Sequence, residues 1–502
     1  MISKLVVGEK GVVSDHQLAS LVGIDILKKG GNAFDAAIAI SAVLSVVQPH
    51  SGGIGGDAFL LGFMDDDIIA YASSGRSPRG FDPDEFIRNK PLRGPLTVTI
   101  PGLVYLWGMI YEEYGYMRIE DLLEPAIKLA SNGFHVGLSL SSASKISEIE
   151  LSQYKWSHYF KGLELGGRYV NRDMARALRV LATRGWDEFY YGELAEQITR
   201  ELQDQGVNTG LDDLMDHEGH IVEPLRLELD NMVLYELPPN TQGISTLQLI
   251  SALYELELYK HDMNSPDRVL KWSEPIDNVY RFRDLYIGDP DSMTIDPQSY
   301  VKYTYAKNLL EKQAKITNNS NDRAGDTTFF IVSDGEVIIG FIQSLFYGFG
   351  SGLIISGFPV QNRAIGFAKK RGLPNSPAPG KLPLHTLSVL GVDRGDEKYI
   401  IGCVGGDMRP QLHLRVFENI FAYNMRIDKA IATPRFIYTK TYNGQEVSVE
   451  KPFTPPSGNK IKITEVPYGE LRGHVHVGIL GENMLMLACD PRSEGIPIAI
   501  GD

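Results

Sequence analysis

A long, almost entirely apolar segment, NAFDAAIAISAVLSVV at residues 32–47, dominates the first part of the chain. Its length and alanine content predict a helix, with Asn32 as the cap and Asp35 in the first turn, where the helix dipole favours an acid. A helix that is apolar on all sides is buried, so we expect it in the core. Residues 105–115, 119–133 and 174–185 repeat apolar positions at helical spacing and end at a glycine, which predicts further helices.

Strand-like patterns are concentrated after residue 325. Residues 326–346 contain two β-branched and aromatic runs around Asp334-Gly335, a typical β-hairpin sequence. The preceding polar stretch, residues 315–326, has no apolar periodicity and predicts an exposed loop. Taken together, these patterns predict a large α/β body of helices and mainly antiparallel strands.

Composition argues against several classes of protein. The chain has 502 residues, is 43% hydrophobic and has a formal net charge of −14, which is typical of a globular protein and argues against binding nucleic acid. Its two cysteines, Cys403 and Cys489, are outside any CxxC motif, and we expect both to be buried and reduced. The N-terminus lacks a secretory apolar stretch and no window is long enough to span a membrane, so we expect a cytoplasmic protein.

Thr327 carries the main candidate chemistry, because it follows the small polar break Gly325-Asp326 and opens an apolar strand. If the Asp326–Thr327 bond is cut, Thr327 carries both a hydroxyl nucleophile and a free α-amine, and needs no separate triad. The α-amine has an ordinary pKa of about 7.7–8.0, which suits a general base. Taken alone, however, a threonine at the start of a strand is more often structural.

Two other kinds of site are not favoured. The glycine-rich residues 51–56 follow a helix and precede a strand, whereas a phosphate-binding loop needs the opposite order. His50, His385 and His413 are far apart and have no partner at metal-ligand spacing. We therefore expect neither a metal nor another cofactor.

Several segments, in the same order along the chain, resemble the γ-glutamyltransferase family of N-terminal-nucleophile hydrolases. They are LASLVGIDILKKGGNAFDAAIAISAVLSVVQPHSGGIGGDAF (18–59), TVTIPGLVYLW (97–107), LLEPAIKLASNGF (122–134), ELPPNTQGISTLQLI (236–250), GDTTFFIVSDG (325–335), QSLFYGFGSG (343–352), LPLHTLSVL (382–390), CVGGDMRPQLHLRV (403–416) and ACDPRSEGIPIA (488–499). The resemblance implies an αββα sandwich of two stacked sheets between helical layers. It also implies a proenzyme cut at Asp326–Thr327 into a large chain, 1–326, and a small chain, 327–502, which together form one intertwined body.

The resemblance also assigns catalytic positions. Thr327 aligns with the family nucleophile, and Gly405-Gly406 aligns with the glycines whose N–H groups form the oxyanion hole. Ser344 aligns with a threonine or serine that contacts the nucleophile and assists cleavage. Without the resemblance, Ser344 reads as a structural residue of a strand and the two glycines as a turn.

The chain differs from the family at positions that recognise the α-carboxylate and α-amine of a γ-glutamyl group. Ser74 stands where the transferases have a carboxylate-binding arginine, four residues before an aligned proline. Phe346 replaces an asparagine, and a polar and acidic pair that binds the α-amine aligns with Arg363 and Gly366. Loss of polar recognition groups indicates a changed substrate preference.

The resemblance nevertheless indicates a substrate site around the nucleophile. The residues expected to bind substrate there are Arg76, Asn362, Arg363, His385 and Thr386. His385-Thr386 takes the place of a serine pair of the family. Arg76 and Arg363 remain compatible with an acyl group that carries a carboxylate.

The resulting hypothesis is a γ-glutamyltransferase-like, self-processing threonine amidohydrolase or acyltransferase. Its expected partners are a γ-glutamyl amide such as glutathione, or a related acyl amide, with water or an amine as acceptor. Two alternatives stay open: a glutaryl-type amidase similar to the cephalosporin acylases, and an unprocessed, non-catalytic relative that binds small acyl compounds. No nucleic acid or membrane partner is expected, and assembly into a homo-oligomer is left open.

Overall fold

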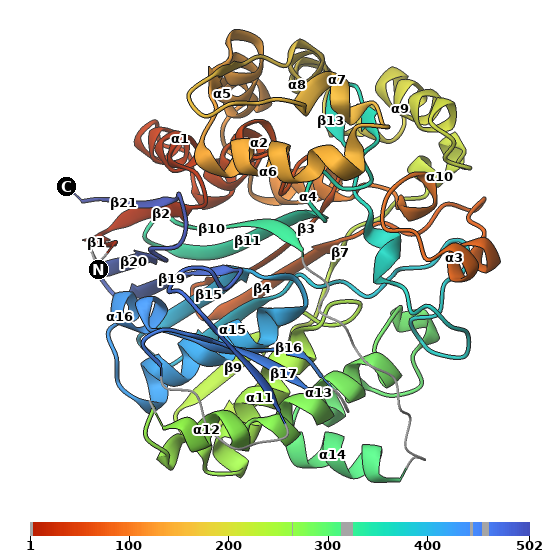
Figure 1. Cartoon of the computed structure of the whole chain (residues 1–502). Helices are drawn as coiled ribbons and strands as arrows, with labels where there is room; N and C mark the ends of the chain where they lie inside the picture. Colours follow the sequence, from red (N-terminus) through yellow and green to blue (C-terminus); the bar gives the residue numbers. More distant parts are fainter. Residues whose placement is uncertain (1–3, 264, 313–324, 442–444, 454–460, 502) are drawn as a thin grey trace.

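The computed structural model describes residues 4–263, 265–312, 325–441, 445–453 and 461–501. Two seven-stranded antiparallel sheets lie face to face, and helices cover the outer face of each sheet (Figure 1). This arrangement confirms the predicted αββα sandwich. Segments before and after Thr327 contribute strands to both sheets, so the two parts of the chain interleave.

The two sheets are built from strands that are distant in sequence. The sheet that contains Thr327 has the order β21 (Ile496–Ile500), β2 (Lys10–Ser14), β10 (Asp326–Ser333), β11 (Val337–Phe346), β3 (Asp57–Met64), β4 (Asp67–Ser73) and β7 (His220–Ile221). The second sheet has the order β1 (Leu5–Gly8), β20 (Met484–Cys489), β19 (His474–Gly481), β15 (Lys398–Val404), β14 (Val389–Asp393), β9 (Met232–Glu236) and β8 (Leu225–Leu229). A smaller sheet contains β16 (Phe436–Lys440), β17 (Glu446–Glu450) and β18 (Lys462–Val466).

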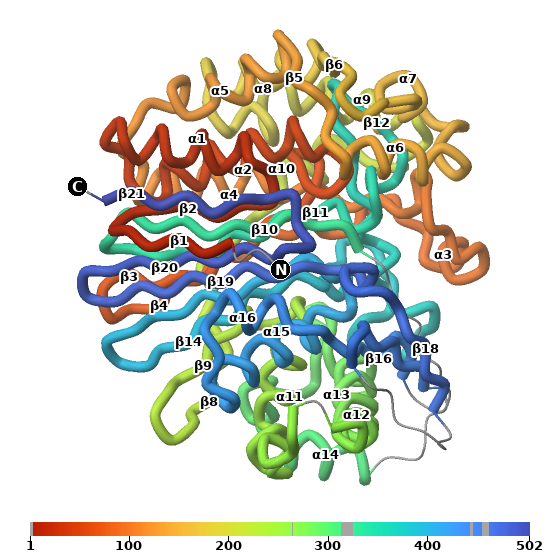
Figure 2. The backbone as a smooth tube through the Cα atoms, turned by 60° about the vertical axis from the view of Figure 1, so that its left-hand side comes forward, coloured from red at the N-terminus to blue at the C-terminus, as the bar shows by residue number. Residues whose placement is uncertain are grey.

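The helices form two outer layers, visible above and below the sheets when the molecule is turned (Figure 2). The layer over the Thr327 sheet includes α1 (Gln17–Lys28), α2 (Ala33–Val47), α4 (Leu103–Tyr114), α5 (Ile119–Asn132), α6 (Leu138–Leu151), α8 (Arg172–Arg184) and α9 (Glu193–Asp204). The opposite layer includes α11 (Gly243–Glu255), α12 (Pro266–Lys271), α13 (Ser273–Tyr286), α14 (Tyr303–Glu311), α15 (Arg409–Phe417) and α16 (Ile427–Ala432). Within the described residues, no helix is both long and apolar enough to cross a bilayer.

Strand β10 shows why its sequence is continuously apolar instead of alternating. Phe329 and Ile331 pack between the two sheets, whereas Phe330 and Val332 pack against the helical layer. Successive side chains of a strand point to opposite faces, and here both faces are covered. Thr327 therefore starts a strand that is buried on both sides.

The helix predicted at residues 32–47 is α2, and all of its residues are buried. The Asn32 side chain accepts hydrogen bonds from the N–H groups of Phe34 and Asp35, each at 2.9 Å, and its amide donates to the Tyr114 carbonyl at 2.7 Å. The Asp35 carboxylate in turn accepts from the Asn32 N–H. This capping box satisfies donors that a buried helix end would otherwise leave unpaired.

The other predicted elements are also found. Helices α4, α5 and α8 cover the three segments with helical spacing, and β10 and β11 pair as the predicted hairpin. Of the predicted loop at 315–326, residues 315–324 lie outside the described residues.

Replacement of Asn32 tests how much the α2 cap contributes to the stability of the protein. We expect Asn32→Ala to lower the free energy of unfolding by about 1–2 kcal/mol, because two helix N–H groups lose their acceptor. Urea denaturation measures the change. Asn32→Ser keeps a capping oxygen and should lose less; equal stability of Asn32→Ala and the wild type would contradict the capping role.

Candidate active site

A shift in strand register sets the position of Thr327. Asp326 pairs with Phe346, but Thr328 pairs with Gln343, so β11 has one extra residue opposite Thr327. Such bulges bend a strand and redirect its side chains. Phe346, beside the bulge, has a φ of 81°, an uncommon conformation for a bulky residue. The irregular pairing brings Ser344 of β11 next to the peptide bond that precedes Thr327.

Ser344 lies between the predicted nucleophile and the predicted scissile carbonyl. Its hydroxyl donates to the Asp326 carbonyl oxygen at 2.7 Å, and the Thr327 hydroxyl lies 3.3 Å from the Ser344 Oγ. The Phe346 N–H and the Arg363 guanidinium both donate to the same Oγ, at 2.9 and 3.2 Å. Because a hydroxyl has one proton, these donors leave that proton for the Asp326 carbonyl. Ser344 can therefore polarise the carbonyl that a nucleophile would attack.

A second guanidinium reaches the Thr327 hydroxyl itself. Arg409, the first residue of α15, donates from Nη2 to Thr327 Oγ1 at 3.4 Å and from Nε to the Cys403 carbonyl at 3.0 Å. A positive charge beside the hydroxyl favours its deprotonated, nucleophilic form. Arg409 was not predicted from the sequence, although it lies four residues after Gly405, within the family-like segment 403–416.

Arg363 and Arg409 make the surroundings of Thr327 electropositive. Both are completely buried, and Arg363 Nε and Arg409 Nη1 have no hydrogen-bond partner within the described residues. Burial lowers the pKa of Arg363 to about 9, against the opposing charge of Asp57, and burial also lowers the pKa of Arg409. Arg363 therefore stays protonated at neutral pH. Unpaired, charged donors of this kind match a carboxylate or an oxyanion.

The predicted oxyanion glycines lie against the chain that leads to Thr327. Gly406 has a φ of 54°, a region that favours glycine, and its carbonyl accepts from Gln242 at 2.9 Å. A Cβ placed on Gly325 would lie 3.1 Å from the Gly406 Cα. Gly405 caps the short 3-10 turn Gly406–Met408, which leads directly into α15 and its first residue, Arg409. The structure thus brings Gly406 to the cleavage segment, with Gly405 directly before it in the chain.

His385 is held by hydrogen bonds within the protein. Its Nδ1 accepts from the Leu387 N–H at 3.2 Å, so the proton is on Nε2, which donates to Asp57 at 3.1 Å. Burial lowers the pKa of His385 well below its usual value, helped by the charges of Arg363 and Arg409. Burial also raises the pKa of Asp57 to about 7, opposed by Arg363. Both ring nitrogens of His385 are thus used within the protein.

The remaining predicted substrate residues divide into two groups. Thr386 accepts from Arg363 Nη1 at 3.4 Å and so lies at the site. Asn362 instead accepts from the Tyr347 N–H and donates to the Leu92 carbonyl. Arg76 pairs with Asp289 at 3.1 Å and Asp291 at 3.3 Å. The structure brings Arg363 and Thr386 to Ser344, but engages Asn362 and Arg76 in contacts elsewhere.

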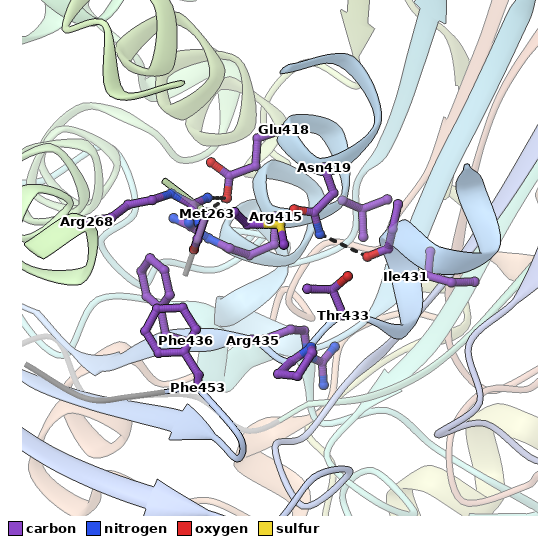
Figure 3. A pocket seen from close by; sticks show the side chains of 13 residues that line it. Met263, Arg268, Arg415, Glu418, Asn419, Ile431, Thr433, Arg435, Phe436 and Phe453 are labelled. Atoms are coloured by element: carbon purple, nitrogen blue, oxygen red, sulfur yellow. Dashed lines mark hydrogen bonds and ion pairs between the residues drawn. The ribbon is translucent and has the colours of Figure 1, made fainter. Parts of the chain in front are cut away.

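A separate pocket lies beside α15 and the smaller sheet (Figure 3). Glu418 pairs with both Arg268 and Arg415 there, and the Arg415 guanidinium lies 4.0 Å from the centre of the Phe436 ring. Thr327 is not among its lining residues. These buried arginines are held by a carboxylate and by aromatic faces, apart from the nucleophile.

The model of the family described as Gamma-glutamyltranspeptidase matches residues 19–500. The chain belongs to the gamma-glutamyltranspeptidase family. It is 32% identical to the glutathione hydrolase-like YwrD proenzyme of Bacillus subtilis, covering 99% of this chain and 100% of that protein. It is 29% identical to the oxamate amidohydrolase proenzyme of Klebsiella pneumoniae, over 96% and 97% of the two chains.

Solved structures agree with this assignment. The cephalosporin acylase from Bacillus halodurans superposes with a TM-score of 0.88 at 27% identity, covering 99% of this chain and 97% of the acylase. A chain of the gamma-glutamyltranspeptidase from Pseudomonas nitroreducens matches 60% of this chain, with a TM-score of 0.55. In this family member, Ser344 and Arg409 contact the hydroxyl of the predicted nucleophile, and Arg363 contacts Ser344.

Removal of the Ser344 hydroxyl tests its contact with the Asp326 carbonyl. We expect Ser344→Ala to slow cleavage of the Asp326–Thr327 bond by about 10²–10³-fold, the usual cost of losing one oxyanion donor. Denaturing gels of freshly expressed protein would follow the conversion, and Ser344→Thr should restore it.

Ser144 supplies a matched control, because its buried hydroxyl also donates to a backbone carbonyl, that of Phe160 in the helical layer. Ser144→Ala should cleave at the wild-type rate. Equal rates for Ser344→Ala and Ser144→Ala would exclude the proposed role of Ser344.

Proposed function

We propose that this family member cleaves its own Asp326–Thr327 bond and then hydrolyses amides whose acyl group carries a carboxylate. The observation that supports it best is the arrangement of the Thr327 hydroxyl, the Ser344 hydroxyl and the Asp326 carbonyl. The names of the relatives agree, since proteins matching over nearly the whole chain are described as proenzymes of hydrolases.

Self-cleavage follows from this geometry in two steps. The Thr327 Oγ attacks the Asp326 carbonyl carbon while Ser344 donates to the developing oxyanion. The C–N bond then breaks, the proton lost by the Thr327 hydroxyl passes to the departing Thr327 nitrogen, and an ester joins the Asp326 carbonyl to the threonine oxygen. Water hydrolyses that ester, which leaves a carboxylate on Asp326 and a free amine and hydroxyl on Thr327.

Turnover repeats the same chemistry on a substrate amide. The free α-amine of Thr327 accepts the hydroxyl proton, and the oxygen attacks the substrate carbonyl to form an acyl-enzyme. The proton passes to the leaving amine, and water, or an amine acceptor, then removes the acyl group. Arg409 lies beside the Thr327 oxygen, and the N–H groups of Gly405 and Gly406, which the family resemblance assigns to the oxyanion hole, would supply the rest of the positive field that this chemistry needs.

The two buried arginines favour an anionic acyl group without a nearby ammonium. A substrate carboxylate would pair with Arg363 and Arg409, which have unpartnered donors within the described part of the chain. A γ-glutamyl group also carries an α-ammonium, and the same two guanidinium groups would repel it at short range. We therefore place glutaryl-type amides ahead of γ-glutamyl amides. The 29% identical oxamate amidohydrolase is, by its name, an enzyme for a small amide that carries a carboxylate.

The second candidate remains a glutathione-hydrolase-like activity on γ-glutamyl compounds. Its support is the 32% identical glutathione hydrolase-like relative, which is matched along its whole length. The two candidates share the nucleophile and differ in the group beside the substrate carboxylate. One pair of chromogenic substrates therefore separates them.

Glutaryl 4-nitroanilide and γ-glutamyl 4-nitroanilide differ only in the α-ammonium group. We expect kcat/KM for the glutaryl compound to be at least about tenfold higher, because like charges at a buried site cost several kcal/mol. Arg363→Gln should lower kcat/KM for the glutaryl compound and reduce the ratio between the two substrates.

Arg118 is exposed and pairs with Asp121, so Arg118→Gln serves as a control for loss of one arginine. That variant should keep the wild-type ratio. A preference for the γ-glutamyl compound that Arg363→Gln leaves unchanged would overturn the assignment of Arg363 and favour the second candidate.

A further inference from the structure

Asp15, His474 and His476 form a cluster that connects the two sheets. Asp15 directly follows β2 of one sheet, and the two histidines lie on β19 of the other. Alternate residues of a strand point to the same side, so both imidazoles reach the same carboxylate. Their Nε2 atoms lie 2.5 and 2.8 Å from Asp15 Oδ1, and the three atoms all lie within 4.8 Å of one another.

We propose that Asp15, His474 and His476 together bind one divalent transition-metal ion such as zinc. Two imidazoles and one carboxylate are a donor set that zinc and its neighbours in the first transition row accept. None of the three residues has a role in the proposed Thr327 chemistry, and a metal ion bound to them would hold the two sheets together. The histidines considered from sequence, His50, His385 and His413, are not part of it.

The surroundings of Asp15 fit a metal-binding carboxylate. Its second oxygen, Oδ2, accepts from the Phe329 N–H of β10 at 2.7 Å, which holds the carboxylate in place and leaves Oδ1 facing the histidines. Second contacts of this kind orient the ligands of metal sites. The Ser493 hydroxyl, 3.5 Å from Oδ1, is a further oxygen nearby.

Size and access also agree with a metal ion. Zinc bonds of about 2.0–2.1 Å at tetrahedral angles place ligand atoms roughly 3.4 Å apart. The two carboxylate–imidazole distances must therefore open by less than about 1 Å. Asp15 and His476 are buried, whereas the His474 side chain is 22% exposed. That opening gives an ion a path from solvent and leaves a position for a water ligand.

Metal uptake by the whole purified protein tests this proposal. After treatment with a chelator, the protein is dialysed against zinc chloride alone, and bound metal is measured by elemental mass spectrometry. We expect one zinc per chain in the wild type and at least a tenfold weaker affinity in His474→Ala, which changes the exposed ligand. Equal uptake by wild type and His474→Ala, or no uptake by either, would overturn the site.

Two further measurements keep the outcome clear. His220 is exposed on β7 and is not part of the cluster, so His220→Ala should bind zinc as the wild type does. If His474→Ala does not fold, cobalt(II) replaces zinc in the wild type. Visible d–d bands of a four- or five-coordinate ion with nitrogen ligands would support the site. A spectrum identical to that of aqueous cobalt would contradict it.

Discussion

The extra residue in β11 opposite Thr327 is the constraint on which the rest of the site depends. In the register that the rest of the hairpin keeps, Ser344 would pair directly with Thr327; the shift leaves Ser344 and Leu345 together opposite Thr327, and the Ser344 hydroxyl lies 2.7 Å from the Asp326 carbonyl. The bulge persists because β10 and β11 are buried on both faces and cannot slide without displacing the core between the sheets. The reactive geometry is thus held by packing.

The second constraint on the site is the positive charge of two buried arginines. The chain as a whole is acidic, yet two fully buried guanidinium groups lie around its nucleophile. Burying a charge is costly unless it is paired, and Arg363 and Arg409 keep unpartnered donors within the described residues. An anionic substrate would satisfy those donors. The same positive field that assists the Thr327 oxygen therefore also selects the acyl group.

Local signals in the sequence predicted local structure well. The apolar run at 32–47 and the turn at Asp334-Gly335 predicted α2 and the β10–β11 hairpin, because spacing and turn chemistry act between near neighbours. The contacts of the site join distant residues: Arg409 is 82 positions from Thr327, Asp57 is 328 from His385, and His474 is 459 from Asp15. Periodic patterns do not predict such distant pairs. The residues around 325–332 suggested Thr327 as a nucleophile, and the family resemblance supported that suggestion and added Ser344, Gly405 and Gly406. The resemblance did not predict every contact: Arg76 and Asn362 were expected at the substrate site, but other partners hold their side chains.

The most direct test of the central claim is the intact mass and N-terminal residue of the purified protein. The account predicts two fragments of roughly 36 and 20 kDa, dividing 55.7 kDa in proportion to residue number, with Thr327 as the first residue of the smaller one. Thr327→Ala should remain a single chain. A wild-type protein that stays uncut after prolonged incubation, or that is cut at another bond, would contradict Thr327 as the self-processing nucleophile.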